Sequence, residues 1–85
     1  MAHRWTPQDD LKALYLYLHG EGDCGTYESL GDTLGMGESA LRMRGRNISY
    51  VATGTGLSHP SKQTIATYHR HKETPQAELR KLAFG

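Results

Sequence analysis

The sequence predicts an all-α fold, in which four to five short helices form a compact domain. Two threonine-proline pairs, Thr6-Pro7 and Thr74-Pro75, have the residue types that cap a helix and open its first turn. Between the glycine-rich segments, apolar residues recur three or four positions apart, which is the spacing of a helix face, and no alternating strand pattern stands out. Eighty-five residues without an internal repeat correspond to one helical domain, residues 1–85.

The first helix is expected from Pro7 to about His19, with Thr6 as its N-cap. Asp9 and Asp10 follow the cap, where the positive end of the helix dipole favours acidic side chains. A core-facing stripe at helical spacing consists of Leu11, Leu14, Tyr15 and Leu18. The sequence therefore predicts an amphipathic first helix with a well-defined start.

Two helices separated by a tight turn are predicted next. The glycine-rich segment 20–25 lacks the lysine and hydroxyl residue that end a phosphate-binding loop, so we interpret it as a connector. Residues 26–34, opened by a threonine cap, then form a helix, residues 35–37 break it, and a third helix runs over about residues 38–51. This order predicts a helix-turn-helix-like unit over about residues 26–52.

The third helix has two faces of different character. Its buried side is expected to consist of Leu41, Ile48 and Ala52, and its exposed side of Ser39, Arg42, Met43, Arg46 and Tyr50. Gly45 lies within the buried stripe. Because glycine lowers helix propensity, we expect it at this position to allow the close approach of another helix.

The remainder of the chain adds a fourth helix and a short fifth one. After a loop over residues 53–60, Ser61 can cap a helix over about residues 62–72. Its inward-facing residues are expected to be Ile65, Ala66 and either Tyr68 or His69. The apolar residues of the last helix are Leu79, Leu82 and Ala83.

Charge is distributed unevenly, although the net charge is only +1. The first 38 residues hold two basic and seven acidic side chains, whereas the last 47 hold eight basic and two acidic ones. This asymmetry favours one anion-facing side and argues against a wholly acidic DNA mimic; the alternative is a dipolar surface with no partner. No apolar run approaches the roughly 20 residues of a membrane span, and the single Cys24 fits a reducing cytoplasm.

Three arginines in five residues, Arg42, Arg44 and Arg46, are the strongest functional signal. The guanidinium group is planar, permanently charged and able to form paired hydrogen bonds, which suits guanine edges and phosphates. Arg42 and Arg46 share a helix face, whereas Arg44 points about 160° away from Arg46. We expect Arg42 and Arg46 to make the main contacts with nucleic acid. Arg44 is expected to pair with an acidic residue or to reach a flanking phosphate. The alternative is a solvated face that forms salt bridges with the acidic N-terminal half.

Other polar and aromatic residues could support such an interface. Ser39, near the start of the third helix, could donate to a phosphate, and Lys62 follows a helix cap, where backbone amides also favour an anion. Tyr17 and Tyr50 could stack on bases if they are exposed. Asn47 can read adenine, although we favour a hydrogen bond to a neighbouring loop backbone.

Metal-binding and catalytic patterns are weak. On a helix, His69 and His71 point about 200° apart and cannot share one ion, and Cys24 and His59 match no zinc spacing. Ser58-His59 has no acidic residue at a recognisable triad spacing. We therefore expect no enzyme activity, no metal and no cofactor.

A family resemblance covers about residues 5–70. It is carried by Trp5-Thr6, Leu11, Ala13-Leu14, Leu16-Tyr17-Leu18, Leu30, Leu34-Gly35, Leu41, Met43-Arg44, Asn47-Ile48, Val51, Gly56-Leu57-Ser58 and Ser61-Lys62. These residues resemble the helical domain that precedes the catalytic part of many prokaryotic HNH endonucleases and related restriction-like proteins. The Trp-Thr pair before a helix is also similar to Myb/SANT-like domains. The resemblance implies a compact DNA-binding helical module. The sequence itself contains no His-Asn…His arrangement of the kind that the catalytic part uses.

The sequence thus predicts a small, non-catalytic, cytoplasmic module that binds nucleic acid, with duplex DNA as the first expectation, as a monomer or weak dimer. The competing hypothesis is a phage or mobile-element protein that docks on a nucleic-acid enzyme, such as a nuclease complex, and regulates or inhibits it. The modest net charge favours this second hypothesis slightly over free DNA binding. Salt dependence separates the two, because DNA binding through several phosphates falls steeply with salt.

Overall fold

The computed structural model describes residues 4–22 and 24–85, and the predicted all-α fold is confirmed for this part of the chain. The five helices that it contains are α1 (Pro7–His19), α2 (Tyr27–Leu34), α3 (Glu38–Thr53), α4 (Lys62–His71) and α5 (Gln76–Phe84). The ends of α1 to α4 agree with the predicted ends to within two residues, and α5 is the short last helix that was predicted without bounds. Asp23, in the predicted connector, and residues 1–3 lie outside the described residues.

Side-chain caps begin three of the helices, α1, α2 and α4, as the sequence predicts. The fourth predicted start, Thr74-Pro75, was wrong in detail, because the N-cap of α5 is Pro75 and it has no side-chain cap hydrogen bond. The Thr6 hydroxyl accepts a hydrogen bond from the Asp9 backbone N–H, and the Asp9 carboxylate accepts one from the Thr6 N–H, both at 3.1 Å. Thr26 and Ser29 form the same reciprocal pair at the start of α2. Ser61 caps α4 by accepting from the backbone N–H of residue 64. These bonds satisfy amides that otherwise have no partner within the helix.

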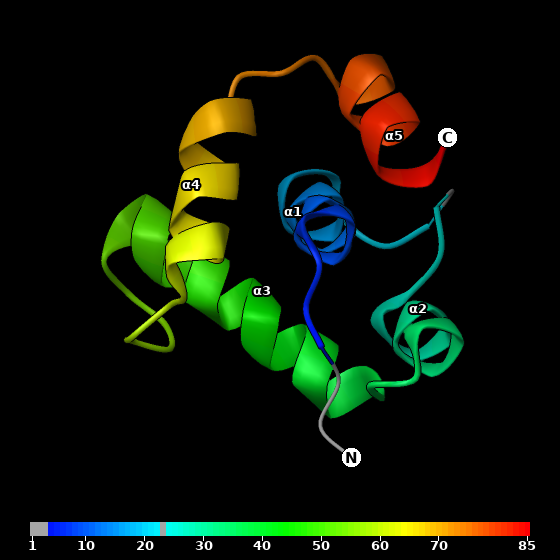
Figure 1. Ribbon diagram of the computed structural model, residues 1–85, viewed down its shortest axis with the longest axis horizontal. Helices are drawn as coiled ribbons and strands as arrows, with labels where there is room; N and C mark the ends of the chain where they lie inside the picture. The colour runs from blue at the N-terminus through cyan, green and yellow to red at the C-terminus, as the bar shows by residue number, and fades with distance from the viewer. Residues whose placement is uncertain (1–3, 23) are drawn as a thin grey trace.

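The arrangement of the helices centres on α1, which packs against α3, α4 and α5, while α2 packs against α3 (Figure 1). The chain passes from α2 to α3 in three residues. Gly35 has a φ of +77°, a left-handed conformation that glycine adopts without strain. The N–H groups of Met36 and Gly37 then both donate to the carbonyl oxygen of Gly31 at 3.0 Å. This tight turn brings α3 beneath α1.

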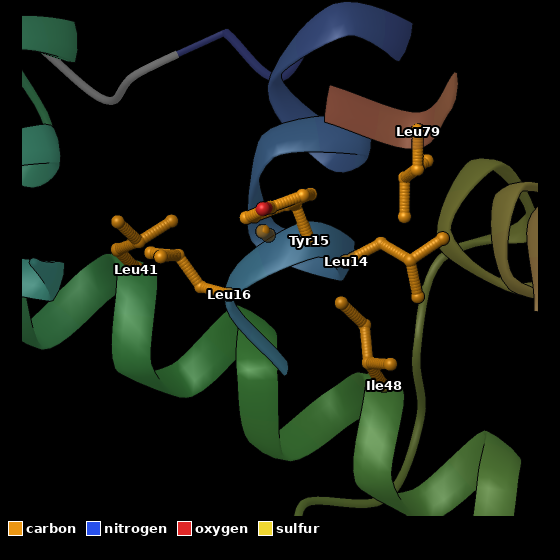
Figure 2. Packing of buried hydrophobic residues seen from close by; sticks show 7 residues of the cluster. Leu14, Tyr15, Leu16, Leu41, Ile48 and Leu79 are labelled. Atoms are coloured by element: carbon orange, nitrogen blue, oxygen red, sulfur yellow. The ribbon is translucent and has the colours of Figure 1, made fainter. Parts of the chain in front are cut away.

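The hydrophobic core lies between α1, α3 and α5 (Figure 2). Its fully buried members are Ala13, Leu14, Tyr15, Leu16, Leu41, Ile48 and Leu79. The predicted stripe on α1 was therefore partly wrong, because Leu11 and Leu18 are only half-buried whereas Ala13 and Leu16 are buried. A helix that is covered on several sides buries residues around much of its circumference, so one stripe does not describe it.

The inward faces predicted for α4 and α5 also need correction. Ile65 is 36% exposed and Ala66 is exposed, whereas the polar Thr64 is 1% exposed. On α5, Leu79 and Ala83 are buried as predicted, but Leu82 is 44% exposed. α4 turns Thr64 inward because the Thr64 hydroxyl forms hydrogen bonds with the buried side chains of Arg44 and Asp10. The spacing of apolar residues, on which the prediction was based, does not indicate such polar contacts.

Candidate functional site

The outer face of α3 carries the predicted exposed residues. Ser39, Arg42, Met43, Arg46 and Tyr50 are all exposed, with Met43 at 52% and Tyr50 at 39%. The opposite face carries the buried residues Leu41, Arg44, Gly45 and Ile48. The three arginines are therefore divided between the two faces, as their helical spacing predicts.

Arg44 lies on the inner face and is buried, with 9% of its surface exposed. Its Nε lies 3.5 Å from Oδ1 of Asp10, which is buried on α1. Its Nη1 donates to Oγ of Ser61 at 3.0 Å and to Oγ1 of Thr64. The guanidinium carbon lies 3.9 Å from the centre of the Trp5 ring. One side chain therefore connects α1, α3, α4 and the segment that precedes α1.

The Asp10 carboxylate has further partners in this buried network. The Thr64 hydroxyl donates to Oδ1 at 3.0 Å, and the Gln63 side-chain amide donates to Oδ2. Burial lowers the pKa of the Arg44 guanidinium, and the Asp10 carboxylate opposes that shift. Of the two roles predicted for Arg44, the geometry shows the ion pair, so we remove Arg44 from the candidate interface. Asp10 precedes Gln63 and Thr64 by 53 and 54 residues, so no local sequence motif signals that these side chains meet.

Arg42 lies on the outer face and is partly neutralised by carboxylates. Its Nε donates to Oε2 of Glu38 at 2.7 Å, and its Nη2 lies 4.0 Å from Oε2 of Glu21. The hydrogen bond to Glu38 raises the pKa of Arg42. Its guanidinium carbon lies 4.8 Å from the centre of the Tyr27 ring. For this arginine, the alternative of salt bridges to the acidic half of the chain is confirmed.

Arg46 is exposed, and within residues 4–22 and 24–85 its guanidinium has no hydrogen bond or ion pair. Together with Arg42 it lines a groove between α1, α2 and α3, which we call the arginine groove. The other lining residues are Tyr17, Tyr27, Gly45 and Ser49. A Cβ at Gly45 would lie 3.2 Å from the Tyr27 hydroxyl, so the predicted close approach at this glycine is confirmed.

The remaining predicted residues lie elsewhere. Lys62 is exposed at the first position of α4 and does not line the arginine groove. Tyr50 lines a second groove, beside Pro60 and Ile65. The Asn47 side-chain oxygen is buried and has no hydrogen-bond partner among the described residues, so it does not form the expected bond to a loop backbone.

In comparisons with known proteins, no family model, no curated protein and no solved structure matches this chain. In the described part of the chain, no three histidine, cysteine, aspartate or glutamate side chains come together to hold a metal ion. None of the helices described has both the length and the apolar character that crossing a membrane requires. The resemblance to the HNH-associated helical domain stays a prediction.

Proposed function

We propose that this chain is a non-catalytic module that binds duplex DNA through the outer face of α3. In this proposal α2, the three-residue turn and α3 act as a helix-turn-helix unit, and α3 is the helix that enters the major groove. The observation that carries the proposal is that the Arg46 guanidinium is exposed and has no hydrogen bond or ion pair among the described residues. Arg46 lies on a face of α3 that also presents Ser39 and Tyr50.

Each exposed side chain of this face can make a contact that is known from protein–DNA complexes. Arg46 can bind phosphate oxygens or a guanine edge, and Ser39 can donate to a phosphate. Met43 and Tyr50 offer apolar contact of the kind that thymine methyl groups accept. Because the chain carries a net charge of only +1, affinity should be modest at physiological salt and should depend strongly on salt.

The test is a fluorescence anisotropy titration of a labelled random-sequence duplex at low and at moderate salt. We expect salt-sensitive binding by the wild type and clearly weaker binding by the double variant Arg42→Ala/Arg46→Ala, with its unfolding midpoint close to that of the wild type. The matched control is Lys72→Ala/Lys81→Ala, which also removes two exposed cations, one at the far end of α4 and one on α5. Unchanged DNA affinity in a folded double variant would refute the proposal.

A second candidate function is docking on a protein, in particular on a nucleic-acid enzyme. It is favoured by large apolar side chains that remain exposed: Met43 at 52%, Tyr50 at 39% and Ile65 at 36%. Exposed apolar side chains that lie together often mark protein contact sites, and Tyr50 and Ile65 line one groove. The same titration separates the two functions, because absence of DNA binding even at low salt would favour the protein partner.

A further inference from the structure

The arginine groove combines two cationic side chains with two tyrosines where three helices meet. We propose that this groove seats a phosphate of the DNA backbone, and that the Glu21 carboxylate occupies part of that seat in the free protein. This inference rests on the proposed function and assigns its two arginines a specific task. They hold the strand in position, and the sequence is read by other residues of α3.

The position of the groove favours a phosphate over a base edge. Arg42 and Arg46 are one helical turn apart, which places their Cβ atoms about 5–6 Å from each other, so both can reach one phosphate. They lie on the flank of the outer face that turns towards Tyr17 and Tyr27. Met43 lines a different groove on the other flank. When a helix lies in the major groove, its neighbouring elements approach the strand backbones, so a flank that meets α1 and α2 faces phosphates.

One carboxylate of the chain itself, that of Glu21, lies beside two residues that line the groove, Tyr27 and Arg42. Oε2 of Glu21 accepts a hydrogen bond from the Tyr27 backbone N–H at 2.8 Å and lies 4.0 Å from Nη2 of Arg42. One carboxylate oxygen thus contacts the first amide of α2 and an arginine together. A phosphate presents the same kind of oxygen, and it would compete with Glu21 for these donors.

Tyr27 holds the groove in shape. Its ring lies beneath the Arg42 guanidinium, and its hydroxyl lies against α3 where Gly45 leaves room. The Tyr27 hydroxyl is protonated at neutral pH, because the ordinary pKa of a tyrosine is about 10 and burial raises the pKa of Tyr27 further. Tyr27 is therefore a positioning residue that directs Arg42 towards the mouth of the groove.

Replacement of Glu21 gives the most direct test, because it should strengthen binding. Glu21→Gln removes the charge but keeps an oxygen that can accept from the Tyr27 N–H, so the start of α2 is preserved. We expect affinity for duplex DNA to rise about two- to fivefold, the range that an exposed ion pair is worth. The matched control is Glu28→Gln, which makes the same change of net charge at an exposed position in the first turn of α2.

Single replacements of the two arginines complete the test. Because the two arginines share one phosphate, the double variant Arg42→Ala/Arg46→Ala should reduce the log–log salt slope by about 0.9. Each single replacement should weaken binding equally for duplexes of unrelated sequence. A loss that depends on sequence would assign the arginines to base reading and overturn the inference. Equal affinities of Glu21→Gln and Glu28→Gln would overturn it as well. In both cases wild-type binding would persist, whereas a wild type that does not bind DNA would refute the proposed function itself.

Discussion

Arg44 and Arg46 are two residues apart on one helix, yet the fold uses them in opposite ways. Arg44 is buried between three helices and has an ion pair, two hydroxyl hydrogen bonds and an aromatic ring as partners. Arg46 is exposed, and its guanidinium has no partner among the described residues. The difference follows from helical phase, since residues two apart point to nearly opposite sides. A cluster of arginines in the sequence is therefore not one binding site.

The energetic consequences of the two positions also differ. A buried guanidinium has lost its hydration, so it depends on each partner that the interior provides. An exposed guanidinium is hydrated, and its removal disturbs little of the folded structure. The inner face of α3 should therefore determine stability, and the outer face should determine binding. The predictions below test this division.

The largest effect is expected for Arg44→Ala. It leaves the Asp10 carboxylate, which is 1% exposed, without its cation. Removing one member of a buried ion pair typically costs about 3–5 kcal/mol, and we expect a loss of this size in the free energy of unfolding measured by urea denaturation. Arg46→Ala should change the same quantity by less than about 0.5 kcal/mol.

A double replacement shows whether the instability of Arg44→Ala comes from the unpaired Asp10 charge or from the lost connection between helices. Replacing both members of a buried pair with apolar residues of similar size is often neutral. Arg44→Met/Asp10→Leu should thus be more stable than Arg44→Ala. Equal stabilities of Arg44→Ala and Arg46→Ala would contradict the division between the two faces.

A smaller loss is expected for Thr64→Val. The Thr64 hydroxyl accepts from Arg44 and donates to Asp10, and valine keeps the shape of the side chain without either bond. Leaving buried polar groups unsatisfied costs about 1–3 kcal/mol. Thermal and urea unfolding should both report this loss, with Thr67→Val on the same helix as the control. If Thr64→Val is as stable as the wild type, the network contributes no stability through this hydroxyl.

Local rules predicted the helices well because the relevant signals are local. The caps at Thr6, Thr26 and Ser61 act within three residues, and the break at residues 35–37 needs only glycine and a left-handed turn. Sequence rules failed where the partner of a side chain is remote. Thr64 faces inward because Asp10, 54 residues earlier, accepts its hydrogen bond, and no local pattern contains that information.

The candidate site was predictable to a similar extent. The periodicity of α3 placed Arg42 and Arg46 on one face and Arg44 on another, and the exposure of these residues agrees. The arginine groove was not predictable, because it needs Tyr17 from α1 and Tyr27 from α2 to meet α3. The pairing of Arg42 with Glu21 depends in the same way on how the segment before α2 folds back.

The smallest effect concerns Tyr27, which lies at the boundary between the two faces. Burial raises its pKa above the ordinary value, so the folded state holds the phenolic proton more tightly than the unfolded state. The resulting stability is complete below about pH 10 and is lost as the pH rises through the folded pKa. Tyr27→Phe has no proton to lose at this position, so its free energy of unfolding should fall less steeply than that of the wild type above pH 10. Urea denaturation at neutral and alkaline pH measures the difference, and parallel profiles for the two proteins would show that Tyr27 is not buried against α3 in solution.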